Sequence, residues 1–295
     1  MDAVEVIRSR IRAAVFERVA GSDRPRRQVR VRQDGGERWF AEDRPIRRVH
    51  GDSSMFVGGI RALLLQSLHP LAMAAVAEHS GYRGDPWGRL QRTSYFLGVT
   101  AFGREADARA AIKKVRAIHD HVTGTAPDGR AYAASDPVLL EWVHIAEVDS
   151  FLRAHSTFGA NPLDQRERDG YVEDMARIAV GLGIPDPPRT QAQLAERITA
   201  YRPQLASTPA ARETARFLLL NPPLPLTMRA PYGILAGAAV SLLPRWGRRP
   251  LLLPTFPIAE AAIVRPAGYV MVRAIRWATS TPSPREQPSQ PSPTR

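Results

Sequence analysis

Apolar residues recur every three or four positions along most of this chain, and this spacing limits its fold more than any other feature. Positions three and four apart share one face of an α-helix, which has about 3.6 residues per turn. The spacing predicts helices over residues 2–20, 53–80, 86–103, 104–123, 136–158, 162–182, 191–205 and 209–220, and apolar segments follow at 232–243 and 257–277. No long alternating run typical of a β-strand is present, so we expect an all-α fold.

Composition divides the chain into four segments. Residues 1–49 contain the first helix and an arginine-rich loop with at most a short strand at 28–31, and residues 50–250 form a single multi-helix domain. Residues 251–279 are an apolar helical segment. Residues 280–295 are rich in Pro, Ser and Gln, a composition typical of a disordered tail.

Prolines mark the ends of two predicted helices. Pro70 is expected to break the helix over 53–80 and to leave His69 at the break. Asp136 and Pro137 are typical of a helix start, with an acidic cap followed by proline at the first helical position. Residues 125–135 are expected to form a loop, because Pro, Asp and Gly follow one another at its centre.

The chain has no cysteine, which excludes disulfides, iron–sulfur clusters and thiolate ligands. Its net charge is +12, which suits an anionic membrane surface or nucleic acid. Nucleic acid is disfavoured, because the arginines are spread over most helices without interleaved aromatic residues. A composition rich in Arg, Ala and Pro is typical of bacteria with GC-rich genomes.

The sequence shows no secretory signal, and its longest apolar window, residues 231–244, is shorter than the about 20 residues that span a membrane. We therefore expect a cytoplasmic protein that contacts a membrane only at its surface. Neither glycine-rich nucleotide-binding motif is present, so nucleotide-binding folds are also disfavoured.

Three histidines are predicted to point into the core. His119 shares a helical face with Ile112 and Val115, and His69 and His144 lie on other apolar helices. An inward histidine can be a hydrogen-bonded core residue, a general base, or a ligand of a metal or haem. The spacing alone does not choose among these roles.

Arg89, Arg92 and Thr93 fall on one face of the helix over 86–103. A haem needs an axial histidine, an apolar slot, and cationic or hydroxyl partners for its propionates. Together with the inward histidines, these side chains would suit a buried slot of haem size. Arg89, Arg92 and Thr93 are therefore candidate catalytic residues, and Arg89 and Thr93 are also candidate cofactor-binding residues with His69, His119 and His144.

Other catalytic centres find less support. Glu141 and His144 form one Glu-x-x-His motif, whereas a di-iron bundle needs two copies and two further glutamates. The zinc protease motif His-Glu-x-x-His and the hydrolase motif Gly-x-Ser-x-Gly are both absent from the sequence.

Several short motifs resemble, in this order, the MpaB-type oxygenase and rubber oxygenase (latex clearing protein) family. They are Arg61 to Gln66 with His69-Pro70, Arg89 to Thr93, Phe102-Gly103, Val115 to Val122, Tyr132 to Pro137 and Trp142-Val143-His144. The resemblance covers about residues 50–250. It implies an all-helical catalytic domain that binds one b-type haem and uses dioxygen to cleave carbon–carbon double bonds in isoprenoid chains.

The resemblance also assigns roles to single residues. It implies that His119 is the proximal iron ligand and that Arg89 and Thr93 lie beside the haem. Arg92 stands where rubber oxygenases have a lysine, and a guanidinium is a poor iron ligand. The family's glutamate base has no counterpart here, so rubber or isoprenoid cleavage is less supported than an apolar substrate in general.

Two other functions remain open from the sequence. One is a non-enzymatic haem-binding or lipid-binding protein at the membrane surface, with His69 or His144 as a second haem ligand. The other is a helical domain whose histidines are purely structural.

Overall fold

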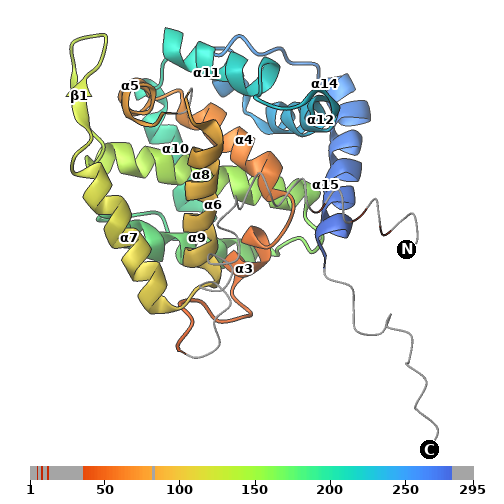
Figure 1. Cartoon of the computed structure of the whole chain (residues 1–295), viewed down its shortest axis with the longest axis horizontal. Helices are drawn as coiled ribbons and strands as arrows, with labels where there is room; N and C mark the ends of the chain where they lie inside the picture. Colours follow the sequence, from red (N-terminus) through yellow and green to blue (C-terminus); the bar gives the residue numbers. More distant parts are fainter. Residues whose placement is uncertain (1–4, 6–7, 9–11, 13–35, 82–83, 281–295) are drawn as a thin grey trace, which may run out of the picture.

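The structure, a computed structural model, describes residues 5, 8, 12, 36–81 and 84–280. Its central helix is α8 (Pro137–Phe158) (Figure 1). The helices that pack on α8 are α3 (Pro45–His50), α4 (Met55–Gln66), α5 (Pro70–His79), α9 (Gln165–Leu182), α10 (Gln191–Tyr201), α12 (Leu226–Leu242) and α15 (Arg265–Thr279). The Asp136 side chain accepts a hydrogen bond from the backbone N–H of Val138, which confirms the predicted helix start. The described part of the chain is thus all-α, as predicted, apart from one small hairpin.

The predicted break at Pro70 is confirmed. α4 ends at Gln66, α5 begins at Pro70, and the two helices are bent by 109°. His69 lies between them with an extended backbone, and its Nδ1 accepts a 3.4 Å hydrogen bond from the backbone N–H of Ala72. Within the described ranges, no single helix is long and apolar enough to cross a membrane, and only the bent pair of α4 and α5 passes that test together.

α6 (Pro86–Phe102) and α7 (Glu105–His119) pack against each other, and α7 also contacts α9. The helix predicted to continue to residue 123 instead ends at His119. The predicted loop over 125–135 was also wrong in part, because β1 (Thr123–Thr125) pairs antiparallel with β2 (Ala131–Ala133). Strands of three residues are too short for an alternating pattern to reveal them. The Tyr132 hydroxyl donates a hydrogen bond to the Glu78 carboxylate, which ties the hairpin to α5.

The C-terminal helices differ from the prediction at their boundaries. The helix predicted over 191–205 ends as α10 at Tyr201 and continues as a 3₁₀ turn (Arg202–Gln204), followed by α11 (Pro209–Leu220). α12 begins at Leu226 and holds Pro231 inside it, since one proline removes a single backbone hydrogen bond without ending the helix. The segment over 257–277 consists of α14 (Pro257–Ala259), a π-helical turn (Glu260–Val264) and α15.

Two short helices were not predicted: α3, and α13 (Arg245–Arg248). Most of the predicted first helix over 2–20, the strand at 28–31 and the tail after Ser280 lie outside the described residues.

Candidate functional site

One face of α8 carries polar side chains into the interior of the fold. His144, Glu147 and Phe151 share this face, because they are three, four and seven residues apart. The ring of His50, the last residue of α3, meets the edge of the Phe151 ring at 5.4 Å between centroids. Nε2 of His50 lies 3.2 Å from the hydroxyl of Tyr171 on α9. We call His50, His144, Glu147 and Tyr171 the interior polar cluster.

Several polar atoms of this cluster lack partners. Nε2 of His144 is buried without a hydrogen bond, and no described residue bonds the Glu147 carboxyl. Burial raises the pKa of Glu147 to about 7 and lowers the pKa of His144 to about 4. Buried polar groups are nearly always paired, so unpaired ones point to a ligand or to water in this part of the fold.

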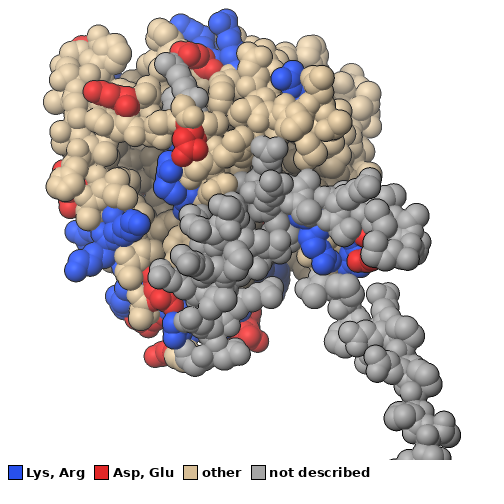
Figure 2. Space-filling view, in the orientation of Figure 1, with Lys and Arg blue, Asp and Glu red and all other residues tan. Residues whose placement is uncertain are grey.

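Open space lies beside α4 and α6. A Cβ atom added to Gly59 on α4 or to Gly98 on α6 would meet no atom within 4 Å. Val143 and Glu147 are only partly buried although α8 is the central helix. Figure 2 shows the surface hollowed beside this region, between α6 on one side and α7 with the hairpin on the other. The space between α4, α6, α7 and α8 is therefore the candidate site.

His119 ends α7, one of the helices that border this space. Its side chain is half-buried, and no described residue forms a hydrogen bond with it. Burial lowers the pKa of His119, and the nearby Asp120 opposes that shift only in part. The imidazole is therefore neutral near pH 7 and has a free lone pair, which is the form that ligates iron.

The three predicted catalytic residues lie in the first half of α6. Arg89 is half-buried, whereas Arg92 and Thr93 are exposed. A nitrogen of the Arg92 guanidinium lies 3.3 Å from a carboxylate oxygen of Asp85, the residue that caps α6. Their catalytic roles stay predictions.

His69 is placed away from the interior polar cluster. Its ring packs against Trp142 and Tyr201, at 6.5 Å and 6.4 Å between centroids, and its Nδ1 caps α5. Trp142 and His144 are two residues apart, so they point about 200° apart around α8. His69 thus has a structural role that accounts for its burial.

Glu141 has partners outside the cluster. It forms an ion pair with Arg197 at 2.8 Å and accepts a hydrogen bond from the Tyr201 hydroxyl at 2.8 Å. No group of three or more His, Asp or Glu side chains in the described ranges is placed to hold a metal ion.

Comparison with known proteins identifies the family. The family described as ER-bound oxygenase mpaB/B' and rubber oxygenase, catalytic domain, matches residues 47–277. The chain belongs to this family. The matched range contains His119 and the whole interior polar cluster, and membership in an oxygenase family implies dioxygen and an oxidisable substrate as partners. No curated protein and no solved structure matches significantly.

His50, Glu147 and Tyr171 were not predicted as site residues. Glu147 could have been found, because it follows His144 by three residues on the same helical face. Nothing in the sequence pairs His50 with Tyr171, since 121 positions separate them.

Proposed function

We propose that this protein is a haem b-dependent oxygenase that uses dioxygen on an apolar, isoprenoid or lipid-like substrate. The observation that carries the proposal is His119, a half-buried, neutral and unpartnered imidazole on a helix that borders open space. The family match adds the reaction class. The sequence resemblance adds the cofactor and its proximal ligand.

Under this proposal, different residues of the chain would bind the haem, bind the substrate and hold a proton. His119 holds the iron, and the haem, when bound, supplies the binding and reduction of dioxygen. Leu63 and Val143, both partly buried, provide apolar surface for the substrate and exclude water. Arg89 and Thr93 pair with the haem carboxylates, as the resemblance implies, and Glu147 holds a proton near neutral pH.

Replacing His119 with alanine is expected to lower the haem-to-protein ratio of the purified protein at least about tenfold, because the residue that would hold the iron is lost. The Soret absorbance relative to protein absorbance measures this ratio. His121→Ala is the matched control, since His121 is exposed two residues further on and should leave the ratio unchanged. A wild-type protein that stays colourless when haem is supplied during expression would contradict the proposal.

A non-enzymatic haem carrier is the second candidate, favoured by the unpartnered Nε2 of His144. Bis-histidine ligation leaves the iron no open position for dioxygen. The spectrum of the reduced protein under carbon monoxide separates the two candidates. Prompt formation of a carbonyl complex supports the oxygenase, and an unchanged six-coordinate spectrum supports the carrier.

We also propose that the protein is cytoplasmic and that part of its surface contacts an anionic membrane. Large apolar side chains are exposed over the C-terminal quarter of the described chain, at Leu220, Leu226, Leu252, Phe256, Ile258, Ile263, Tyr269, Val270 and Trp277. Glu260 is the only acidic residue between positions 221 and 280, and Arg248 pairs with it. Apolar side chains beside arginines that outnumber the acidic residues of this segment suit an interface with anionic lipid.

Replacing both Phe256 and Ile258 with serine is expected to lower the fraction of protein that sediments with anionic liposomes at least about threefold, because the replacement removes inserted apolar surface. Val138→Ser is the control, because Val138 is also apolar and exposed but lies at the start of α8. Equal sedimentation of both variants and the wild type would contradict membrane contact through this surface.

A further inference from the structure

Two partly accessible stripes lie side by side on α4 and α8, although both helices are otherwise largely buried. The stripe on α4 contains Gly59, Leu63 and Gln66, and the stripe on α8 contains Val143 and Glu147. The side-chain nitrogen of Gln66 donates a 3.1 Å hydrogen bond to the Val143 carbonyl, which joins the two stripes at one end. We call the space that these two stripes border the α4–α8 recess.

The two helices run antiparallel, which sets the level of each residue along the recess. Nε1 of Trp142 donates to the Gln66 carbonyl at 3.1 Å, and the Arg61 guanidinium donates to the Ser150 hydroxyl at 2.6 Å. Leu63 lies between Arg61 and Gln66 in the chain, so it is opposite the middle of the stretch between Trp142 and Ser150. Leu63 and Glu147 are therefore at about the same level of the recess.

The recess is enclosed by protein. The Glu147 side chain is partly accessible, yet burial raises its pKa to about 7, so the accessible part does not face bulk water. α6 and α7 pack against each other, and neither is among the helices that pack closely on α8. The ring of His50 connects the two sides, because it meets Phe151 of α8 and hydrogen-bonds the backbone of Leu97 on α6.

Neutral groups surround the Glu147 carboxyl. Burial lowers the pKa of His144 to about 4 and that of His50 to about 3, so both imidazoles are uncharged at pH 7. The Tyr171 hydroxyl is close enough for the charge of Glu147 to raise its pKa, and it is also uncharged. Burial alone shifts the pKa values of Glu147 and His144, so no cation among the described residues acts on either group.

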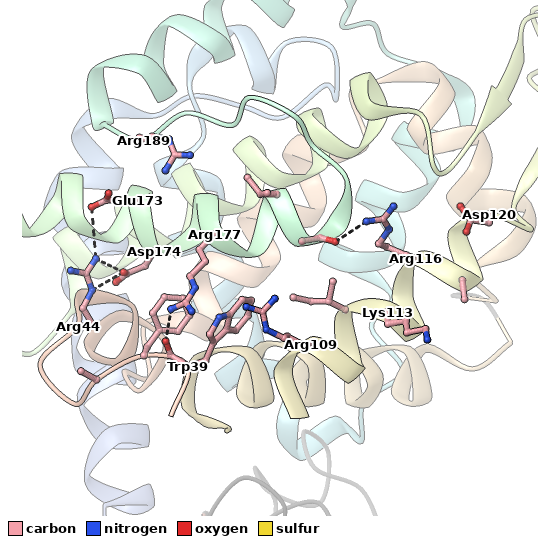
Figure 3. Close-up of a pocket in the computed structure, with 16 residues that line it drawn as sticks. Trp39, Arg44, Arg109, Lys113, Arg116, Asp120, Glu173, Asp174, Arg177 and Arg189 are labelled. Carbon is pink, nitrogen blue, oxygen red and sulfur yellow. Dashed lines mark hydrogen bonds and ion pairs between the residues drawn. The ribbon is translucent and has the colours of Figure 1, made fainter. Parts of the chain in front are cut away.

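Basic side chains gather elsewhere, in a groove that residues of α7 and α9 line. The groove has a volume of about 1120 Å³, and its basic residues are Arg44, Arg109, Lys113, Arg116, Arg177 and Arg189 (Figure 3). None of the residues that line this groove belongs to α4, α6 or α8. These cations therefore do not line the α4–α8 recess.

The chemistry of an unpaired carboxyl among neutral groups determines which ligand atom suits it. A hydroxyl accepts a hydrogen bond from the protonated carboxyl and donates one to the carboxylate, so it pairs with both forms of Glu147. A ligand carboxylate or phosphate can only accept, and the ionised form of Glu147 repels it where no cation compensates. A hydrocarbon leaves the carboxyl unpaired.

We propose that the α4–α8 recess binds the hydroxyl end of an uncharged apolar alcohol, with the hydroxyl on the Glu147 carboxyl and the hydrocarbon chain against Leu63 and Val143. This inference rests on the proposed function, because it names the substrate class of the same site and requires that no iron is bound to His144. Glu147 is then the specificity-determining residue. The net charge of +12 would by itself favour anionic ligands, so the preference for an alcohol is opposite to the long-range electrostatic expectation.

The test is calorimetric titration of the purified full-length protein at pH 7 with four ligands that share one isoprenoid chain: geraniol, geranate, geranyl phosphate and geranylamine. Geraniol should bind at least about tenfold more tightly than geranate or geranyl phosphate, because a site built for a hydroxyl rejects analogues that cannot pair with it. Geraniol should also bind more tightly than geranylamine, since the recess disfavours charge. Tighter binding of any of the three charged ligands than of geraniol would overturn the proposal.

Variants of Glu147 assign the preference to this residue. Glu147→Gln should keep the affinity for geraniol within about twofold, because an amide both donates and accepts, and Glu147→Leu should weaken it at least about fivefold. The affinity of the wild type for geranate should fall between pH 6 and pH 8 as Glu147 ionises, and Glu147→Gln should abolish this fall. Glu196→Gln, exposed on α10, is the control and should change none of these affinities by more than about twofold.

The haem-to-protein ratio of each sample, measured alongside, separates this inference from the proposed function. A protein that takes up no haem but prefers geraniol would contradict the haem proposal and leave the ligand preference intact. A haem-loaded protein that binds geranate as tightly as geraniol would overturn the inference alone. Absence of saturable geraniol binding, or equal geraniol affinity in the wild type and Glu147→Leu, would also overturn it.

Discussion

Replacing Arg61 with methionine is expected to lower the free energy of unfolding by about 3 to 5 kcal/mol, the largest loss of stability we predict for a single substitution in this protein. Arg61 is 1% exposed and joins α4 to α8. Its guanidinium donates to Asp149 at 2.7 Å, to the Ser150 hydroxyl at 2.6 Å and to the Leu242 carbonyl at 3.0 Å. Methionine fills a similar volume but satisfies none of these acceptors.

The expected loss comes from the groups that Arg61 leaves behind. The Asp149 carboxylate would keep Arg153 as its partner, but Arg153 approaches from the solvent side and cannot serve the buried oxygen. The Ser150 hydroxyl and the Leu242 carbonyl would lose their donor inside the core. Unfolding in urea, followed by circular dichroism, measures the change in free energy.

Arg153→Met is the matched control for Arg61→Met. Arg153 donates to the same carboxylate at 2.8 Å, but its side chain is 60% exposed, so its removal should cost under about 1 kcal/mol. Replacing Arg61 and Asp149 together with apolar residues should recover part of the loss, because no buried charge is then left unpaired. Equal effects of Arg61→Met and Arg153→Met would show that burial of the pair adds nothing.

Helical periodicity predicted most of the fold because it acts over short stretches of the chain. Asp136 and Pro137 determine where α8 begins, and Pro70 determines where α4 and α5 separate, in each case through backbone groups within a few residues. The hairpin after α7 was not predicted because its strands are only three residues long, and its contact with α5 joins Tyr132 to Glu78 across 54 positions. Contacts of that span leave no periodic trace in the sequence.

Periodicity also suggested part of the candidate site. His119 and His144 were predicted as site residues because each occupies an apolar helical face, and no described residue bonds the His119 side chain or Nε2 of His144. Their roles stay predictions. Periodicity could not separate His69 from them, because a histidine that caps a helix and packs on Trp142 is as buried as one that faces open space. The groove that residues of α7 and α9 line was not predicted from the sequence, because its basic residues come from segments that only the fold brings together.

Glu147→Gln is expected to stabilise the protein at pH 8 and to leave its stability at pH 4 nearly unchanged. Burial raises the pKa of Glu147 from 4.5 to about 7. Between pH 4.5 and 7, the folded chain therefore keeps a proton on Glu147 that the unfolded chain has lost. The contribution of this group to stability is therefore fully present below pH 4.5 and is lost as the pH rises through 7.

Two histidines of the interior polar cluster change the stability in the opposite sense to Glu147 as the pH varies. Burial lowers the pKa of His144 to about 4 and that of His50 to about 3, so their contributions to stability are present above pH 6.5 and are lost as the pH falls. The wild type and Glu147→Gln share these two histidines. The difference between wild type and Glu147→Gln therefore isolates the carboxyl group from them.

Glutamine resembles the protonated carboxyl in shape and cannot ionise. The increase in the free energy of unfolding at pH 8 on Glu147→Gln therefore equals the destabilisation of the wild type by the ionisation of Glu147 in its buried position. A shift from 4.5 to about 7 corresponds to about 3 kcal/mol. Urea unfolding of the cofactor-free protein at pH 4, 6 and 8 should show the gain growing with pH. Glu196→Gln, on the exposed side of α10, should show no such trend. A gain that is the same at all three pH values would mean that Glu147 is ionised throughout, and the open space beside it would then hold enough water to solvate its charge.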